Sequence, residues 1–448
     1  MRESEYIIDN EALKAGLIAH RASTENSPGL EELMNLRCAS GGLVPVRKLP
    51  IFSDLGDYWP APKILSGPSH DILVDIDDAD TARFYTIQED LSLTLIQSVG
   101  SVTPLMHHLP EMADFEEFIV VVGDFGVLHG TPDTGYTYSS DALANIPLAR
   151  TCCNFRGQLV LGSITSDWYG CGESSVAWSR IGEVDCTPTP NNEAGFMPIK
   201  DAGTVLKVRP SASGVLVFGD TGVFLLPPVS SPAPTFGKTK ISSMGVLTRE
   251  AVDGDELEYV FVGVDKNIYK IDSEGLHSLG YYRYIKDLES SDIKVRFDKL
   301  EREYYISDGV RCFLLTSNGL SEIGQIVGEL LSSGGLTYGV LDESDAVDEW
   351  WIRTGPVDFY QRGMKTLMMV DSDVDDAYVS VLVKNKGGDY ISSPVIKMNP
   401  WNATTHMITG QVFKVMLEGD LTPDVLPSYV KIRWKMVDFR SIRGRYVQ

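Results

Sequence analysis

The most informative segment of this 448-residue chain reads Gly214-Val215-Leu216-Val217-Phe218-Gly219-Asp220-Thr221-Gly222-Val223-Phe224-Leu225-Leu226. Two short β-branched and aromatic runs flank a Gly-Asp-Thr-Gly turn, and this pattern predicts a β-hairpin. Glycine suits such a turn because it adopts positive φ at little cost, and we expect that backbone conformation at Gly222.

The same hairpin text occurs upstream, in Val120-Val121-Val122-Gly123-Asp124-Phe125-Gly126-Val127-Leu128, and looser copies follow. The turns lie near residues 123, 162, 219, 263 and 307, so they recur about every 40 to 50 residues, with a longer interval that we expect to hold a loop over 163–192. Four-stranded propeller blades leave this period in a sequence. We therefore predict an all-β fold whose main part is a β-propeller of about six or seven blades. The residues expected at the blade turns are Gly123, Asp124, Gly219, Asp220, Gly222, Asp265 and Asp308.

The chain divides into three predicted segments: an N-terminal helical arm over 1–40, the propeller over 41–355, and a C-terminal β-sandwich-like domain over 356–448. Helices are expected over 10–20 and 27–36, the second with Ser27 as N-cap and Pro28 in its first turn. An extra hairpin around Asp77-Asp78 extends the repeat toward the N-terminus. The segment 349–353 is expected to close the ring.

Longer alternating strands distinguish the C-terminal segment: 377–384, 390–398, 412–417 and 429–439. In the last of these, Val430, Ile432, Trp434 and Met436 share one face, while Lys431, Arg433 and Lys435 share the other. Such alternation predicts one buried and one solvated face, as in a sandwich. The basic row is a candidate interface for a neighbouring copy, and the alternative is that its side chains only solvate an outer face.

Composition excludes several classes of function. Sixty-two acidic against 39 basic residues give a formal charge of −23, which disfavours a surface that grips nucleic acid or an anionic membrane. No signal-peptide core or long apolar span is present, so we expect neither the usual secretion route nor membrane insertion. The six cysteines contain no C-x-x-C pair, so we expect reduced, buried thiols rather than a metal or redox site.

A search for chemistry gives only partial motifs, and we predict no catalytic, cofactor or metal site. Asp371, Asp373 and Asp375 match the opening of a calcium loop, but Asp376 replaces its glycine and Leu382 its final glutamate. The pair His107-His108 has no carboxylate or cysteine at ligand spacing. A solvated acidic turn and surface histidines are the simpler interpretations.

One resemblance extends over about residues 35–448. Asn35-Leu36-Arg37 followed by Gly41-Gly42-Leu43-Val44-Pro45-Val46-Arg47 resembles the opening of phage tail proteins in which a glycine-led strand precedes a β-propeller. Val176-Ala177-Trp178-Ser179-Arg180-Ile181-Gly182-Glu183, with the later Gly214–Val223 text, is similar to their repeats. The family is the tail nozzle or tubular proteins of short-tailed phages, also called packaged-DNA stabilisation proteins.

This resemblance implies a structural virion protein, assembled in the bacterial host cytoplasm, that forms an axial tail ring. The ring, six-fold in our expectation, would retain packaged DNA and conduct the double strand during ejection. Its partners would be further copies of the chain and the adjoining tail, adaptor or portal proteins. Acidic walls would let DNA slide, because they repel phosphate.

Two alternatives remain: a propeller-based scaffold, and a glycan-binding or depolymerising tail component. A glycosidase would present paired carboxylates at an axial pocket, and a WD-type scaffold would repeat Gly-His and Trp-Asp pairs. The sequence shows neither repeated pattern, so we predict that the chain is not an enzyme.

Overall fold

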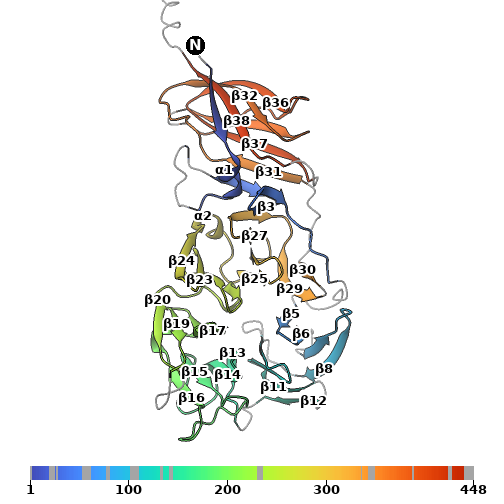
Figure 1. The fold of residues 1–448 in the computed structure, drawn as a ribbon, viewed down its shortest axis with the longest axis vertical. Helices are drawn as coiled ribbons and strands as arrows, with labels where there is room; N and C mark the ends of the chain where they lie inside the picture. Colours follow the sequence, from blue (N-terminus) through green and yellow to red (C-terminus); the bar gives the residue numbers. More distant parts are fainter. Residues whose placement is uncertain are drawn as a thin grey trace, which may run out of the picture.

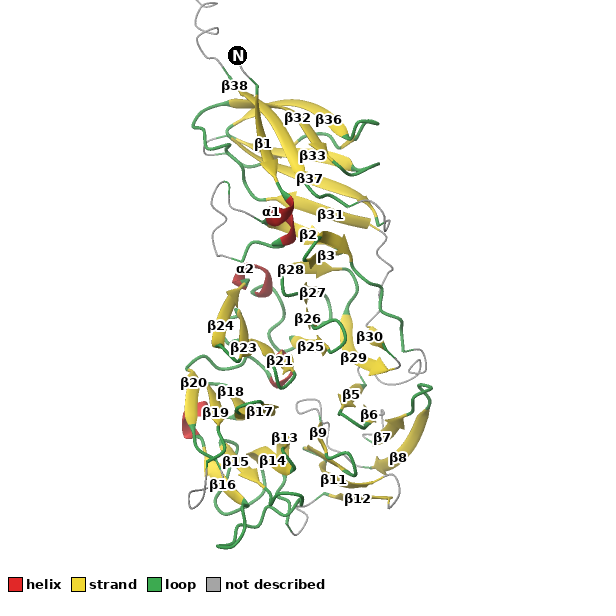
Figure 2. Ribbon diagram, viewed as in Figure 1, coloured by secondary structure: helices red, strands yellow, loops and turns green. Residues whose placement is uncertain are grey.

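The computed structural model describes residues 3–19, 26, 29–52, 62–76, 81–100, 110–131, 135–140, 145–229, 236–333, 335–341, 349–385, 388–421 and 426–437. Within these ranges β-strands dominate (Figure 2). The helical elements there are α1 (Asn10–Lys14), α2 (Tyr282–Ile285) and the short 3-10 turns η2 (Lys200–Ala202) and η3 (Arg249–Ala251). The prediction of an all-β protein is confirmed.

Consecutive strands form four-stranded antiparallel sheets, one after another along the described part of the chain. Each is a meander in which every strand pairs with the next. The strands, sheet by sheet, are β5 (Lys63–Ser66), β6 (Asp71–Ile76), β7 (Ala82–Ile87) and β8 (Leu93–Val99); β9 (Glu111–Asp114), β10 (Ile119–Gly123), β11 (Gly126–Thr131) and β12 (Gly135–Ser139); β13 (Ala149–Phe155), β14 (Gln158–Ile164), β15 (Ser175–Trp178) and β16 (Gly195–Pro198); β17 (Val205–Ser211), β18 (Gly214–Gly219), β19 (Val223–Leu226) and β20 (Thr239–Ser242); β21 (Val252–Gly254), β22 (Tyr259–Val262), β23 (Ile268–Asp272) and β24 (Gly275–Gly280); and β25 (Lys294–Asp298), β26 (Glu303–Ser307), β27 (Cys312–Leu315) and β28 (Leu320–Ile323).

These sheets stand around a ring, as the blades of a propeller do (Figure 1). The first strand of each sheet lies innermost: β9 packs beside β13, β13 beside β17, and β21 beside β25. The hairpin of β29 (Val327–Ser333) and β30 (Leu336–Leu341) fills the remaining gap, because β29 contacts both β25 and β5. Apolar side chains fill the space between neighbouring sheets; Trp178 of β15, for example, meets Phe236 with ring centroids 5.1 Å apart.

The repeated hairpin is the pair of second and third strands in each sheet. Antiparallel pairing joins β18 to β19, β10 to β11, β22 to β23 and β26 to β27 across the predicted turns. The expected hairpin over 72–87 is formed by β6 and β7, while its turn residues 77–80 lie outside the described residues. The turns predicted near residues 123, 219, 263 and 307 are therefore confirmed, whereas the turn predicted near 162 is wrong, because Gly162 lies inside β14 and pairs with Val176.

The interval 163–192 was predicted as a loop, and this prediction is wrong in part. Ser163 and Ile164 lie within β14, and Val176, Ala177 and Trp178 of β15 pair with that strand. All four β15 residues are buried. Because β15 is short and buried on both faces, it lacks the polar alternation by which strands are recognised.

The predicted helical arm over 1–40 is also wrong. The chain starts with β1 (Ser4–Ile8), which pairs with the C-terminal strand β38 (Val430–Met436). Helix α1 covers only the first part of 10–20, and the chain turns at Gly16, where φ is +67°. The second expected helix is replaced by β2 (Leu30–Met34), because long-range pairing with β31 (Glu349–Thr354) outweighs a weak helix propensity.

The segment 349–353 does not close the ring, contrary to prediction. Strand β31 lies between β2 and β37 (Val412–Asp420), and its Trp350 is buried and donates to the carbonyl of Asp420 at 3.1 Å. The segment therefore belongs with the C-terminal strands. The same region contains β3 (Leu36–Ala39) and β4 (Gly42–Pro45), which form a hairpin beside β28.

Two sheets build the C-terminal part, and buried apolar side chains lie between them. One sheet has the order β1-β38-β32-β36; the other continues from blade strands β25–β28 through β2, β31 and β37 to β33. The first sheet includes β32 (Lys365–Ser372) and β36 (Ala403–Gly410). The second includes β33 (Tyr378–Lys384), and the short strands β34 (Ile391–Ser392) and β35 (Ile396–Lys397) pair with β33. The continuous sheet thus joins the ring to the C-terminal part.

The blade turns allow a test at two glycines. Gly222, contrary to expectation, is not among the residues with positive φ, but a Cβ there would lie 2.9 Å from the carbonyl oxygen of Ser242. Gly126 has φ +127°, and a Cβ there would overlap the backbone of Ser139. We expect Gly126→Ala to lower the free energy of unfolding by about 2 kcal/mol or more and Gly222→Ala by less. Urea unfolding of both variants measures the difference, and equal midpoints would contradict it.

Candidate functional site

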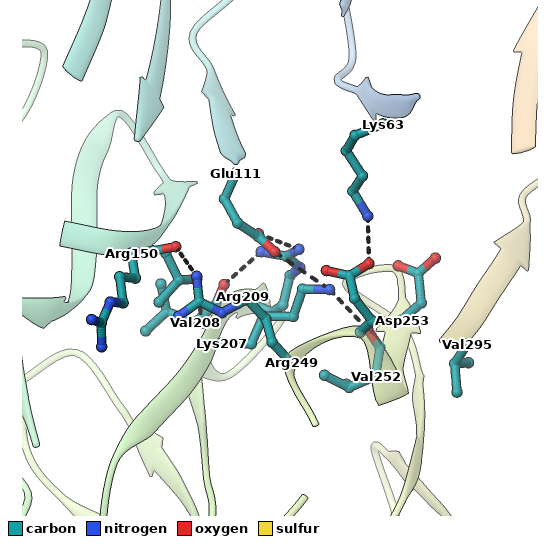
Figure 3. A network of polar contacts seen from close by, with 12 residues as sticks. Lys63, Glu111, Arg150, Lys207, Val208, Arg209, Arg249, Val252, Asp253 and Val295 are labelled. Atoms are coloured by element: carbon teal, nitrogen blue, oxygen red, sulfur yellow. Dashed lines mark hydrogen bonds and ion pairs between the residues drawn. The ribbon is translucent and has the colours of Figure 1, made fainter. Parts of the chain in front are cut away.

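The axis of the ring is occupied by charged side chains from the innermost elements (Figure 3). Lys63 comes from β5, Glu111 from β9, Lys207 and Arg209 from β17, Glu250 from η3, Arg296 from β25, and Glu329 from β29. Their positions follow from the fold, because the first strand of each sheet faces the axis. We call these seven residues the axial cluster.

Each carboxylate of the axial cluster binds cations from other blades. Glu250 contacts Lys63 Nζ and Arg296 Nη2, both at 2.6 Å. Arg296 also reaches Glu329 at 2.5 Å. Glu111 binds Arg209 Nη2 at 2.5 Å and lies 3.5 Å from Lys207 Nζ. The ion pairs therefore cross-link sheets that are far apart in the sequence.

The cations keep the carboxylates of Glu250 and Glu111 ionised. Burial alone would raise the pKa of Glu250, but Lys63, Arg296 and Lys207 outweigh burial and hold the pKa well below its ordinary value. The pKa of Glu111 is likewise lowered, since Arg209 and Lys207 offset its burial. Carboxylates in this state act as counter-ions that hold neighbouring strands together.

A second polar site lies where the ring meets the C-terminal strands. This junction pocket, with a volume of about 310 Å³, is lined by residues of α2, β2, β28 and β31 and by the chain beside them. Its lining consists of Leu17, Glu31, Glu32, Leu33, Met34, Arg283, Tyr284, Asp287, Arg311, Glu322, Trp351 and Arg353. The junction pocket is therefore lined by the half-buried indole of Trp351 together with ion-paired side chains such as Glu31, Arg283 and Arg353.

Glu31 is the centre of the junction. Its carboxylate, in a residue only 5% exposed, contacts Arg283 of α2, Arg353 of β31 and Lys414 of β37. Burial would raise the pKa of Glu31, but hydrogen bonds from Lys414 and Arg283 lower it. The adjacent Glu32 has a raised pKa, chiefly because of burial. Glu31 therefore links α2 of the ring to β31 and β37 of the C-terminal part.

The predicted turn aspartates have structural contacts. Asp220 accepts a hydrogen bond from the backbone N–H of Thr204 at 3.0 Å, and Asp308 accepts one from Glu289 N–H at 3.0 Å. Asp124 accepts from Arg150 at 2.8 Å. Asp265 accepts from the N–H of Asn267 at 3.1 Å within its own turn. The first three link a turn to a neighbouring segment, and the last stabilises the turn itself. Gly123 ends β10 and Gly219 ends β18.

The basic row on β38 is largely engaged within the chain. Lys431 lies 3.2 Å and Arg433 3.4 Å from Glu5 of β1, and Arg433 also reaches Asp371 at 3.1 Å. Lys435 is half-buried and forms no ion pair with the described residues. Lys435 is thus the one member of the row without an ion pair among the described residues, and a docking role for the row stays a prediction.

The other candidates show no assembled site. Asp373 accepts from the backbone N–H of Ser428 at 2.8 Å, which is a structural contact. No group of three or more metal-ligating side chains occurs among the described residues, and the histidine pair 107–108 lies outside them. All six cysteines are free, and burial raises the pKa of the Cys38 thiol to about 12. No helix in the described ranges is long and apolar enough to span a membrane.

Comparisons with known proteins give fold likenesses only. No family model matches the sequence. No curated protein matches it either. PorZ, a surface component of the type-IX secretion system of Porphyromonas gingivalis, is 12% identical with a TM-score of 0.36; the match covers 68% of this chain and 36% of PorZ. The exo-beta-1,3-galactanase of Phanerochaete chrysosporium with beta-1,3-galactotriose is 10% identical with a TM-score of 0.29, over 87% of this chain and 97% of that one. Likenesses this loose assign no activity to this chain.

Little in the amino-acid sequence pointed to either polar site. Lys207 and Arg209 alternate in the sequence of β17 with the apolar residues Leu206, Val208 and Pro210, a pattern that normally indicates a solvated strand face. The available signal was the position of these charges in the first strand of a repeat, which faces the axis of a propeller. Glu31 had no local signal, because its cationic partners are more than 250 residues away.

Proposed function

We propose that this chain is a rigid, propeller-based structural protein, and that its place is an axial ring in the tail of a short-tailed phage. In this proposal the ring of sheets is a seven-bladed propeller, with β29–β30 as its incomplete seventh blade, and the two C-terminal sheets form a sandwich. The partners are further copies of the chain and adjoining tail, adaptor or portal proteins, as the sequence resemblance implies.

The observation that carries the proposal is the continuous sheet between the ring and the C-terminal part. Backbone hydrogen bonds run from β25 through β28, β2 and β31 to β37 and β33, so the two parts share one sheet rather than a linker. Glu31 adds ion pairs at the same junction. A shared sheet resists bending, which suits a component that transmits load.

In this proposal the DNA path lies outside the propeller, because charged side chains occupy the propeller axis. Side chains such as Glu111 and Arg296 occupy the axis and pair across it. In the proposed tail, the double strand passes along the axis of the multi-copy ring, between subunits. The acidic balance of the chain, −23, would repel phosphate there.

The test is the assembly state of the full chain, alone and mixed with its tail neighbours. Light scattering and negative-stain electron microscopy are expected to show a symmetric ring with a central opening, six-fold in our expectation. Lys435→Glu should weaken the ring, because it reverses a charge with no ion pair in the described structure, while the exposed Lys299→Glu serves as matched control. Monomers under both conditions would refute the tail proposal.

The junction pocket favours a second candidate, glycan binding. Sugars bind to aromatic faces and to fixed carboxylate and guanidinium groups, and the pocket contains Trp351 beside Glu32 and Arg353. Binding to a panel of bacterial polysaccharides is expected to be lost in Trp351→Ala. It should persist in Trp401→Ala, whose indole is 85% exposed and does not line the pocket. If the parent binds no glycan, this candidate is wrong.

A further inference from the structure

The axial region has more cations than its carboxylates neutralise. Lys63, Lys207, Arg209 and Arg296 share the carboxylates of the axial cluster. A further cation, Arg249 of η3, lies among them and is only 7% exposed. Its guanidinium has no ion pair with any described residue.

The described residues around Arg249 offer it no free counter-ion. It donates one hydrogen bond, from Nη1 to the carbonyl of Arg150 on β13 (Figure 3). Glu111, Glu250 and Asp124 are near enough to influence its pKa, but each binds another cation.

Asp253 does not supply the missing charge either. Its carboxylate accepts the backbone N–H of Phe297 at 2.9 Å. The axial cluster, Arg249 and Asp253 together comprise five cations and four carboxylates. The surplus belongs to Arg249, which forms no ion pair.

Burying a charge without a counter-ion is energetically unfavourable, and the pKa values of the buried cations reflect this. Burial lowers the pKa of Arg249, and burial also lowers the pKa of Lys207 in spite of nearby Glu111. Guanidinium groups bind small anions through paired N–H donors. We propose that a small inorganic anion, a chloride or a tetrahedral oxyanion such as phosphate, binds at the ring axis against Arg249.

The bound anion would complete the charge balance of the axis and connect η3 to β13 and β17. Its effect is therefore on the stability of the ring of sheets. The inference does not depend on the tail proposal, since it concerns the inside of one chain. A chain that forms no multi-copy ring could still bind the anion.

The experiment measures thermal unfolding of the full chain at constant ionic strength while chloride or inorganic phosphate replaces a bulky organic anion. The midpoint temperature is expected to rise and to saturate with at least one of the two anions, as mass action requires for a single site. Chloride-35 NMR line broadening, and its reversal by phosphate, separates the two anions. General salt effects on burial do not saturate in this way.

Variants assign the site. Arg249→Met should abolish the saturating rise, and Arg249→Lys should weaken binding about tenfold, because it keeps the charge but loses the paired donors. Arg302→Met, at an exposed arginine that binds Asp255 at 2.8 Å, should leave the response unchanged. If Arg249→Met does not fold, the measurements on the parent protein alone test the proposal. The proposal would be overturned if the parent showed neither a saturating rise of its midpoint temperature nor chloride-35 line broadening.

Discussion

Glu250→Gln is expected to lower the free energy of unfolding by about 3–5 kcal/mol, because it leaves two buried cations, Lys63 and Arg296, to share the single carboxylate of Glu329. Glu250 binds Lys63 and Arg296 at 2.6 Å each, and its side chain is only 14% exposed. The measurement is urea unfolding followed by tryptophan fluorescence. Few other single substitutions of similar size should have so large an effect.

The matched control is Glu183→Gln. Glu183 also lies 2.5 Å from an arginine, Arg180, but its side chain is 53% exposed. An exposed pair contributes little, so we expect a change within about 0.5 kcal/mol. If Glu250→Gln and Glu183→Gln unfold at the same urea concentration, the axial cluster does not stabilise the ring.

Acid should act on the same interaction. The folded pKa of Glu250 is far below its ordinary value of 4.5, so its contribution is complete above about 4.5, the pKa in the unfolded chain. That contribution is lost as the pH falls toward the folded pKa. The parent should therefore lose more stability than Glu250→Gln between neutral pH and pH 3. Parallel curves would show that Glu250 is not the group that titrates.

The parts of the fold that the sequence predicted are those with local causes. Turns such as Gly219–Gly222 have residues that suit a tight reversal, and the strands beside them have the composition of half-buried sheet. Such hairpins repeat, and repetition made the ring-like arrangement predictable. Gly222 shows the limit of this reasoning, since its glycine is explained by the nearby Ser242 carbonyl rather than by positive φ.

The parts that the sequence did not predict depend on distant partners. Leu30–Met34 reads as a helix because its glutamates and leucines are good helix formers, but β31 supplies a pairing edge more than 300 residues away. The axial charges could not be predicted for the same reason, because their partners are also distant in the sequence. Arg296 looks like a solvated residue until Glu250 and Glu329 are brought to it by ring closure.

Glu31→Ala is expected to uncouple the ring from the C-terminal part. The substitution leaves Arg283, Arg353 and Lys414 near a buried position with their shared carboxylate removed, which should lower the free energy of unfolding by about 3–5 kcal/mol. Scanning calorimetry is expected to show the C-terminal strands unfolding in a separate transition below that of the ring.

The neighbouring residue provides the control. Glu32→Gln removes a carboxylate that binds Arg353 alone and is 38% exposed, so its effect should stay below about 1 kcal/mol with the transitions unchanged. A Glu31→Ala protein that unfolds as the parent does would mean that the backbone pairing of β2 with β31 suffices to hold the two parts together. A separate early transition would instead show that three ion pairs, converging on one carboxylate from distant parts of the chain, make the shared sheet rigid.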